Sequence, residues 1–144
     1  MPRTFTLVVA ARILLVPYVI ALGLIVWLPA DVASGTTSIV FEFARFVSEQ
    51  SGIPLQTSYT VFEFVANIAL FVPFGLLVAV AWPRLNAWWV ILAGFSTSVL
   101  IELVQLVVPE RVSTISDVIA NTLGTIIGCC AIRSIHPLSK VENG

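Results

Sequence analysis

The fold is decided by residues 64–82, FVANIALFVPFGLLVAVAW, in which no side chain is charged. A bilayer core of about 30 Å requires about 20 mostly uncharged residues in a helix. The span that contains this stretch, from about residue 61 to 82, meets that requirement. Further apolar spans of suitable length cover residues 13–30, about 87–108 and about 115–135. The sequence therefore predicts about four transmembrane helices.

Composition supports an all-α membrane protein. The chain has 144 residues, of which 58% are hydrophobic and only 10% are charged. A soluble domain has about 25% charged residues. The strands of a membrane barrel would alternate apolar and polar residues over about ten positions, and this sequence has no such alternation. We predict a single domain over residues 1–144, a bundle of about four transmembrane helices plus an interfacial amphipathic helix.

Several classes of function are excluded by what the chain lacks. A net charge of −1 without a basic patch argues against nucleic-acid binding. Cys129 and Cys130 are adjacent inside an apolar span, which favours packing over metal binding. His136 is the single histidine and lies in a polar tail, which excludes Ser-His and Cys-His catalysis. We expect no metal and no cofactor. The first span is also longer than the hydrophobic region of a signal peptide, about 7–15 residues, so we expect it to be retained.

Basic residues predict the orientation in the membrane, because lysine and arginine collect in short cytoplasmic loops. If four spans alternate, one side receives Arg3, Arg12, Arg84, Arg133 and Lys140. The other side receives only Arg45 and Arg111. We therefore expect both termini in the cytoplasm, with residues 31–60 and 109–114 outside.

The outer segment 37–50 is predicted to be an amphipathic helix. Its apolar residues recur at helical spacing, whereas its charged residues Glu42, Arg45 and Glu49 occupy another side; the apolar set is Ile39, Val40, Phe43, Ala44 and Val47. This pattern is typical of a helix in the plane of the membrane interface. Such a helix could cover a site from above, or it could simply pack against its neighbours.

Polar residues occur in pairs in the outer halves of three spans, and the members of each pair share one helix face. The pairs are Glu63 with Asn67, Glu102 with Gln105, and Asp117 with Asn121. Structural explanations are available for most of them. Thr60 to Glu63 and Thr114 to Asp117 both fit a capping box, and asparagines often join membrane helices by hydrogen bonds.

Glu102 is harder to explain structurally because it lies about six residues, or about 9 Å, inside its span. A carboxylate facing lipid there would cost a few kcal/mol. We expect Glu102 to face the bundle interior, to be protonated or to pair with Arg111, and to belong to a functional site. In the preceding span, Pro73 and Gly75 lie at mid-depth, where they could produce a kink or be tolerated without one.

In their order and spacing, these residues resemble the motif blocks of the VanZ-like family. The blocks are NIALFVPFG at 67–75, ELVQ at 102–105, Arg111 and DVIANTLG at 117–124, within a core of about 60–132. The family is named for a membrane protein associated with teicoplanin resistance. The resemblance implies a bacterial cytoplasmic membrane protein linked to the cell envelope. By similarity, the polar motif positions are Asn67, Glu102, Gln105, Arg111, Asp117 and Asn121.

The sequence is compatible with functions of three kinds. In the first, a pocket open to the outer leaflet binds an amphiphile, a lipid-linked precursor or an antibiotic such as teicoplanin. Arg111 would hold its phosphate or carboxylate, and Asn67, Gln105 and Asn121 would bind the head group. In the second, Glu102 and Asp117 act as acid and base on lipid-linked head groups. In the third, the polar pairs only hold a scaffold together. The sequence is compatible with an oligomer as well as with a monomer.

Overall fold

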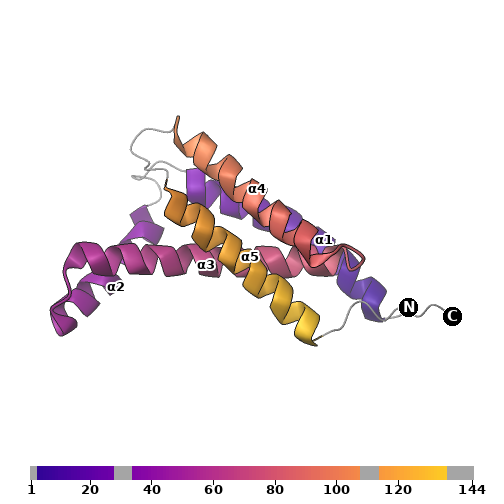
Figure 1. Ribbon diagram of the computed structural model, residues 1–144, viewed down its shortest axis with the longest axis horizontal. Coiled ribbons are helices and arrows are strands. Elements are labelled where there is room, and N and C mark those ends of the chain that lie inside the picture. Colours follow the sequence, from indigo (N-terminus) through magenta and orange to yellow (C-terminus); the bar gives the residue numbers. More distant parts are fainter. Residues whose placement is uncertain (1–2, 28–33, 108–113, 136–144) are drawn as a thin grey trace.

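The computed structural model describes residues 3–27, 34–107 and 114–135, which form five α-helices and no strand (Figure 1). The helices are α1 (Arg3–Trp27), α2 (Ser34–Ser51), α3 (Leu55–Ala81), α4 (Ala87–Gln105) and α5 (Ile115–Ile135). Four of them, all except α2, are long and apolar enough to cross a membrane. The predicted all-α fold with about four spans is therefore confirmed.

The helix boundaries agree with the sequence prediction for α4 and α5 and differ for α1 and α3. The helix α1 begins at Arg3 rather than at residue 13, because the residues before Arg12 are also apolar and continue the helix. The helix α3 begins at Leu55 rather than near residue 61, directly after Pro54, whose backbone is extended with ψ of 135°.

The early start of α3 shows that the capping box predicted at Thr60 and Glu63 is wrong. Both residues lie inside the helix, and the Thr60 hydroxyl donates to the backbone oxygen of Gln56 at 3.0 Å. With 27 residues, α3 is about 40 Å long. That length exceeds a bilayer core of about 30 Å, so α3 must tilt or extend beyond it.

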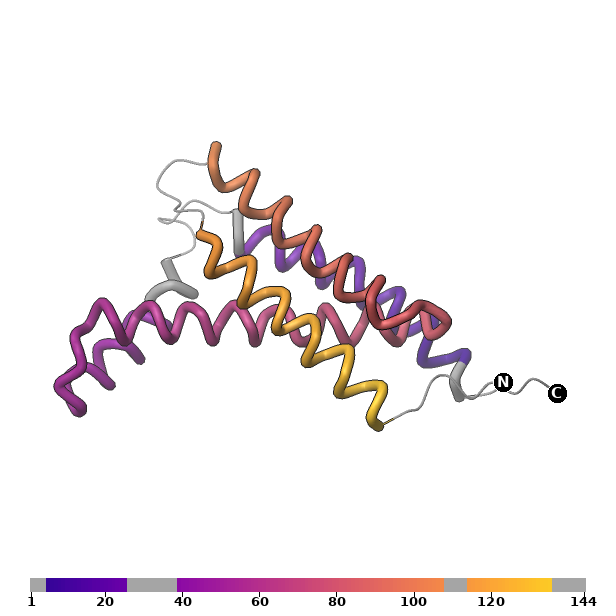
Figure 2. The backbone as a smooth tube through the Cα atoms, viewed as in Figure 1, coloured from indigo at the N-terminus to yellow at the C-terminus, as the bar shows by residue number. Residues whose placement is uncertain are grey.

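The centre of the bundle is α3, which contacts each of the other four helices. It continues through Pro73 as one helix, and its path across the bundle is visible in Figure 2. The Tyr18 hydroxyl of α1 donates to the backbone oxygen of Leu70, one turn before Pro73. The buried core next to this contact consists of Leu22, Phe71, Phe74, Val78, Ala79, Val90, Ile101 and Cys129.

Glycines bring α5 against α3 without intervening side chains. A Cβ added at Gly124 would lie 2.3 Å from the Ile68 backbone oxygen, and one at Gly128 would lie 2.0 Å from that of Val72. Small residues four apart allow such close backbone approach in membrane proteins. The expected close approach at Gly75 is also present, since a Cβ there would lie 2.2 Å from the backbone oxygen of Thr125.

The amphipathic helix predicted at 37–50 is present as α2, and it packs alongside the first part of α3. Ring pairs join the two helices, Phe41 with Tyr59 and Phe43 with Phe62, at centroid distances of 6.5 and 6.3 Å. Gly52, with a φ of 71°, reverses the chain between α2 and α3. The structure thus supports packing against a neighbour, and a position in the membrane interface stays a prediction.

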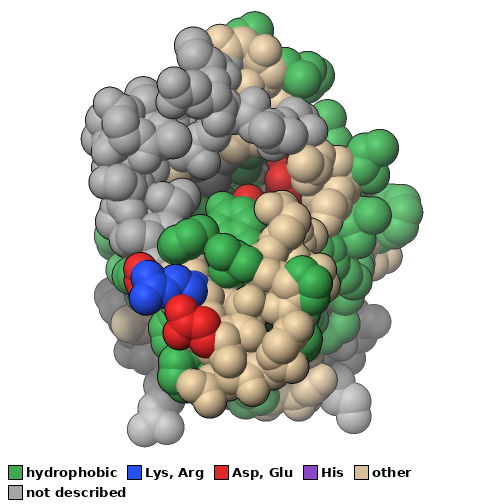
Figure 3. Space-filling view, turned by 90° about the vertical axis from the view of Figure 1, so that its left-hand side faces the viewer, with side chains coloured by type: hydrophobic (Ala, Val, Ile, Leu, Met, Phe, Trp, Pro, Cys, Tyr) green, Lys and Arg blue, Asp and Glu red, His purple; other side chains and the backbone are tan. Residues whose placement is uncertain are grey.

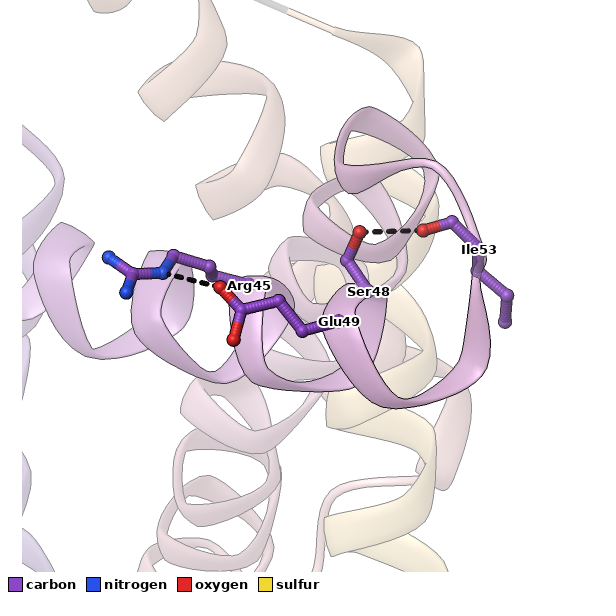
Figure 4. Close-up of polar contacts among 4 residues, drawn as sticks. All are labelled: Arg45, Ser48, Glu49 and Ile53. Atoms are coloured by element: carbon purple, nitrogen blue, oxygen red, sulfur yellow. Dashed lines mark hydrogen bonds and ion pairs between the residues drawn. The ribbon is translucent and has the colours of Figure 1, made fainter.

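The charged side of α2 is exposed, with 55% of the Arg45 side chain and 60% of the Glu49 side chain accessible, and Figure 4 shows the contact between the two. The Arg45 Nε donates to Glu49 Oε1 at 3.0 Å, and the Ser48 hydroxyl donates to the Ile53 backbone oxygen at 2.7 Å. The bond to Glu49 and the charge of Glu42 raise the pKa of Arg45, which therefore stays positive. Because the pair is solvent-exposed, it contributes little to stability.

Candidate functional site

Polar side chains from three helices gather at the end of the bundle where α4 ends and α5 begins. The residues are Asn67 of α3, Ser98 and Glu102 of α4, and Asp117, Asn121 and Thr125 of α5. Figure 3 views this end of the molecule and shows acidic side chains in a recess beside hydrophobic ones. Four of the six sequence-predicted residues, Asn67, Glu102, Asp117 and Asn121, are therefore part of this polar group, and Arg111 lies outside the described residues.

Glu102 faces the interior, as predicted, with only 7% of its surface exposed. Its Oε2 accepts a hydrogen bond from the backbone N–H of Thr114 at 2.9 Å. Thr114 in turn accepts the Asp117 N–H on its hydroxyl at 3.2 Å, which confirms that it caps α5. In the expected capping box, Asp117 would accept the hydrogen bond of the Thr114 N–H. In the structure, Glu102 accepts it instead.

Asp117 uses its side chain to reach a different helix. Its Oδ1 accepts a hydrogen bond from Asn67 Nδ2 at 2.7 Å, and both residues are half-buried. The contact joins Asn67, about halfway along α3, to the first turn of α5. The positive end of the α5 dipole also favours a carboxylate at this position.

Asn121 lies one turn deeper than Asp117 and is buried, with 4% exposure. Its Nδ2 donates to the hydroxyl of Ser98 at 2.8 Å, and the Thr125 hydroxyl donates to its backbone oxygen at 3.0 Å. Its Oδ1 is buried and has no hydrogen-bond partner among the residues that the structure describes. Polar groups in this environment normally have partners, so this oxygen is a vacant acceptor.

Asp117, Asn121 and Thr125 form a line down one side of α5 that we call the polar ladder. It extends about 12 Å from Asp117 at 1.5 Å per residue. Exposure falls along it, from the half-buried Asp117 to the fully buried Thr125. The ladder therefore offers acceptors and donors at increasing depth, from the start of α5 inward.

Gln105 and Glu63, the remaining members of the predicted polar pairs, differ from each other in exposure. Gln105 lies on the same buried face of α4 as Glu102, one turn nearer the end of the helix. Glu63 is exposed, although it shares a face with Asn67, so the first predicted pair is divided between the surface and the site. Within the described residues, no group of three or more His, Cys, Asp or Glu side chains is placed to hold a metal ion.

Sequence reasoning missed Ser98 and Thr125. Both could have been found by helical spacing, since Ser98 lies four residues before Glu102 and Thr125 four residues after Asn121. They were missed because serine and threonine are common in membrane helices and carry no charge to mark them.

Comparison with known proteins identifies one family. The VanZ/LLP1 family model matches residues 14–136, nearly the whole chain, so the likeness extends beyond the core of about 60–132 to include most of α1 and all of α2. No curated protein and no solved structure is significantly similar to the chain.

Proposed function

Because the chain belongs to the VanZ/LLP1 family, we propose that it is a bacterial inner-membrane protein that binds the polar part of an amphiphile at the outer ends of α3, α4 and α5. The amphiphile is a lipid-linked envelope precursor or a lipoglycopeptide antibiotic such as teicoplanin. Capture of the antibiotic at this position would contribute to glycopeptide resistance.

The vacant Asn121 Oδ1 is the observation that carries this proposal. A buried acceptor without a donor costs about 1–3 kcal/mol. A hydroxyl or ammonium group of a ligand would supply the donor and recover that free energy. Asn67 and Asp117 lie above Asn121 and are half-buried, so the ligand would meet them first on entering from the outer end.

Arg111 would bind a phosphate or carboxylate of the ligand, because its planar guanidinium forms paired hydrogen bonds with such groups. Its position in the chain supports this role. Arg111 comes three positions before Thr114, whose amide binds Glu102.

The surroundings of the site suit an amphiphile rather than a fully polar ligand. Leu103 and Leu106 on α4 and Ile119 on α5 lie next to the site residues in the sequence and are strongly exposed. In a bilayer these side chains would contact acyl chains. A ligand with its polar part on the ladder could thus keep its chain in the surrounding lipid.

The test measures binding of a labelled polyprenyl phosphate, and separately of teicoplanin, to purified protein in lipid nanodiscs. We expect Arg111→Ala to weaken binding at least tenfold, because it removes the only basic side chain proposed for the site. Glu42→Gln is the matched control, since it changes an exposed charge on α2 rather than on the helices that form the site. It should leave binding unchanged.

Melting temperatures of the same samples separate lost binding from lost folding. If Arg111→Ala and Glu102→Gln both bind each ligand as tightly as the unchanged protein, the site does not bind these amphiphiles. If the two variants lose melting temperature and the folded fraction still binds normally, the polar residues serve the scaffold alone.

A membrane transferase or hydrolase is the second candidate. It is favoured by the unequal burial of Glu102 and Asp117, because carboxylates in unlike surroundings can divide acid and base roles. Glu102, the more buried, would donate a proton to the leaving group, and Asp117 would take a proton from the attacking hydroxyl or water. Turnover of a labelled lipid-linked precursor by purified protein, abolished by Glu102→Gln, would favour this function over binding alone.

We also propose that both termini face the cytoplasm. Arg12, Arg84 and Arg133 lie at the end of the bundle opposite Glu102 and Asp117. Arginine and lysine favour the cytoplasmic side. The candidate site would then face the outer leaflet, where lipid-linked precursors and glycopeptides are encountered.

A further inference from the structure

The short turn between α3 and α4 is held by arginines from two other helices. The turn is closed by a hydrogen bond from the Leu85 N–H to the Trp82 backbone oxygen at 3.0 Å. Arg12 of α1 donates its Nε to the Ala81 backbone oxygen at 3.1 Å, and Arg133 of α5 donates its Nη2 to that of Leu85 at 2.6 Å. The two guanidinium groups therefore bind carbonyls on either side of one turn.

These bonds leave most of the arginine donors unused, because a guanidinium carries five N–H groups. The Nε of Arg133 is buried and has no partner among the residues that the structure describes. Arg84 lies within the turn itself, is exposed, and makes no hydrogen bond or ion pair with another described residue. We call Arg12, Arg84 and Arg133 the basic end of the bundle.

No described acidic side chain is available to neutralise the basic end. The described acidic residues all lie toward the other end of the bundle, on α2, early in α3, late in α4 and at the start of α5: Glu42, Glu49, Glu63, Glu102 and Asp117. Figure 1 shows the α3–α4 turn close to the start of α1 and away from α2. Within the described part of the chain, the basic end is therefore a concentration of positive charge without an acidic neighbour.

Tryptophans mark the same end as a membrane interface. Trp82 lies beneath the Arg12 guanidinium, 5.7 Å from ring centroid to Cζ, and is exposed. Trp88 and Trp89 in the first turn of α4 are also strongly exposed. Tryptophan is enriched where membrane helices meet lipid head groups. The unused arginine donors thus lie at the depth of phosphates rather than of acyl chains.

We propose that the basic end binds the head-group phosphate of an anionic phospholipid of the inner leaflet. Arginine pairs with phosphate oxygens through parallel N–H bonds. Basic pockets between helices on the cytoplasmic side are a known arrangement for anionic lipid head groups. The basic end is formed by α1, α5 and the α3–α4 turn, and it is separate from the candidate site at the outer end. A bound lipid would therefore join α1 and α5 across the α3–α4 turn.

The test uses quenching of tryptophan fluorescence by brominated lipids in nanodiscs. Trp27→Phe removes the tryptophan at the far end of α1, so the remaining tryptophans report on the basic end. Brominated phosphatidylglycerol is compared with brominated phosphatidylcholine, each diluted into unbrominated phosphatidylcholine. We expect half-maximal quenching at a fraction of the anionic lipid that is more than about tenfold lower, because three arginines contribute.

Arg84→Gln is the decisive variant, because Arg84 binds no described residue and its loss should not disturb folding. It should reduce the lipid preference about fivefold, the contribution of one arginine near an anionic membrane surface. Arg12→Gln with Arg84→Gln and Arg133→Gln should abolish the preference. Arg45→Gln is the matched control, since it removes the same charge at the other end and should leave the preference intact.

Equal quenching by the two lipids in the unchanged protein, or an unchanged preference in Arg84→Gln, would overturn the proposal. Inorganic phosphate at millimolar concentration distinguishes a lipid site from a site for free phosphate. The lipid proposal requires the preference to survive this competitor, and its loss would assign the arginines to free phosphate. None of these results depends on ligand binding at the outer end.

Discussion

Glu102 near the end of α4 accepts a hydrogen bond from the backbone N–H of Thr114, at 2.9 Å, and so joins one helix to the start of the next. Its carboxylate occupies the role that the acid at N3, the fourth residue of a capping box, normally has. Asp117, the residue at that position, is thereby left to bind Asn67 of α3. The exchange ties three helices together near the start of α5.

Removing the Glu102 carboxylate should destabilise the bundle. Glu102→Ala leaves the Thr114 amide without its acceptor, so we expect the free energy of unfolding to fall by about 1–3 kcal/mol. Glu102→Gln keeps an acceptor oxygen and should cost less. Unfolding in mixed detergent micelles measures both variants. Glu42→Ala, an exposed change on α2, is the control, and a Glu102→Ala protein as stable as this control would contradict the prediction.

The burial of polar residues at this end could be predicted from sequence, because polar residues within apolar spans must face the interior. The hydrogen-bond partners of these residues could not be predicted. Spacing along each helix gives a shared face but not the rotation of one helix against another. That rotation depends on contacts such as those of Gly124 and Gly128 with the backbone of α3. The sequence around these glycines does not indicate which part of α3 they contact.

The start of α3 was also beyond prediction, for a different reason. Its first turns, Leu55 to Thr60, are largely polar and do not resemble a membrane span. They are helical because Pro54 fixes where the helix begins and because α2 packs along them through pairs such as Phe41 with Tyr59. Tertiary contact therefore extends the helix beyond its apolar run.

Asn67 and Asp117 should be energetically coupled. A double-mutant cycle with Asn67→Ala and Asp117→Ala isolates the pair from the separate effect of each change. Hydrogen bonds between membrane helices contribute about 0.6 kcal/mol on average and about 1.7 at most. We expect a value in the upper part of that range, because the acceptor is a carboxylate at 2.7 Å. Purely additive effects on unfolding would show that the bond is not formed.

Gly128→Ala should be among the most damaging single changes in the chain. The added Cβ would lie 2.0 Å from the backbone oxygen of Val72, and a helix backbone cannot move aside as a side chain can. Separation of α5 from α3 should cost about 1–3 kcal/mol, the usual range for overpacking. Cys130→Ala, an exposed position on the same helix, provides the comparison. Equal melting temperatures for the two variants would mean that the helices do not approach this closely.

The proposed orientation predicts opposite labelling of the two ends of the bundle. Gln50 at the end of α2 and Leu85 in the α3–α4 turn are both exposed, so cysteine at either position should react once it meets aqueous reagent. In a background in which Cys129 and Cys130 are replaced by alanine, Gln50→Cys should be modified in intact cells by a membrane-impermeant maleimide. Leu85→Cys should react only after the membrane is permeabilised, because Arg12, Arg84 and Arg133 favour the cytoplasmic side. The reverse pattern would place the polar ladder at the cytoplasmic face, and a site there could not intercept an antibiotic that acts outside the membrane.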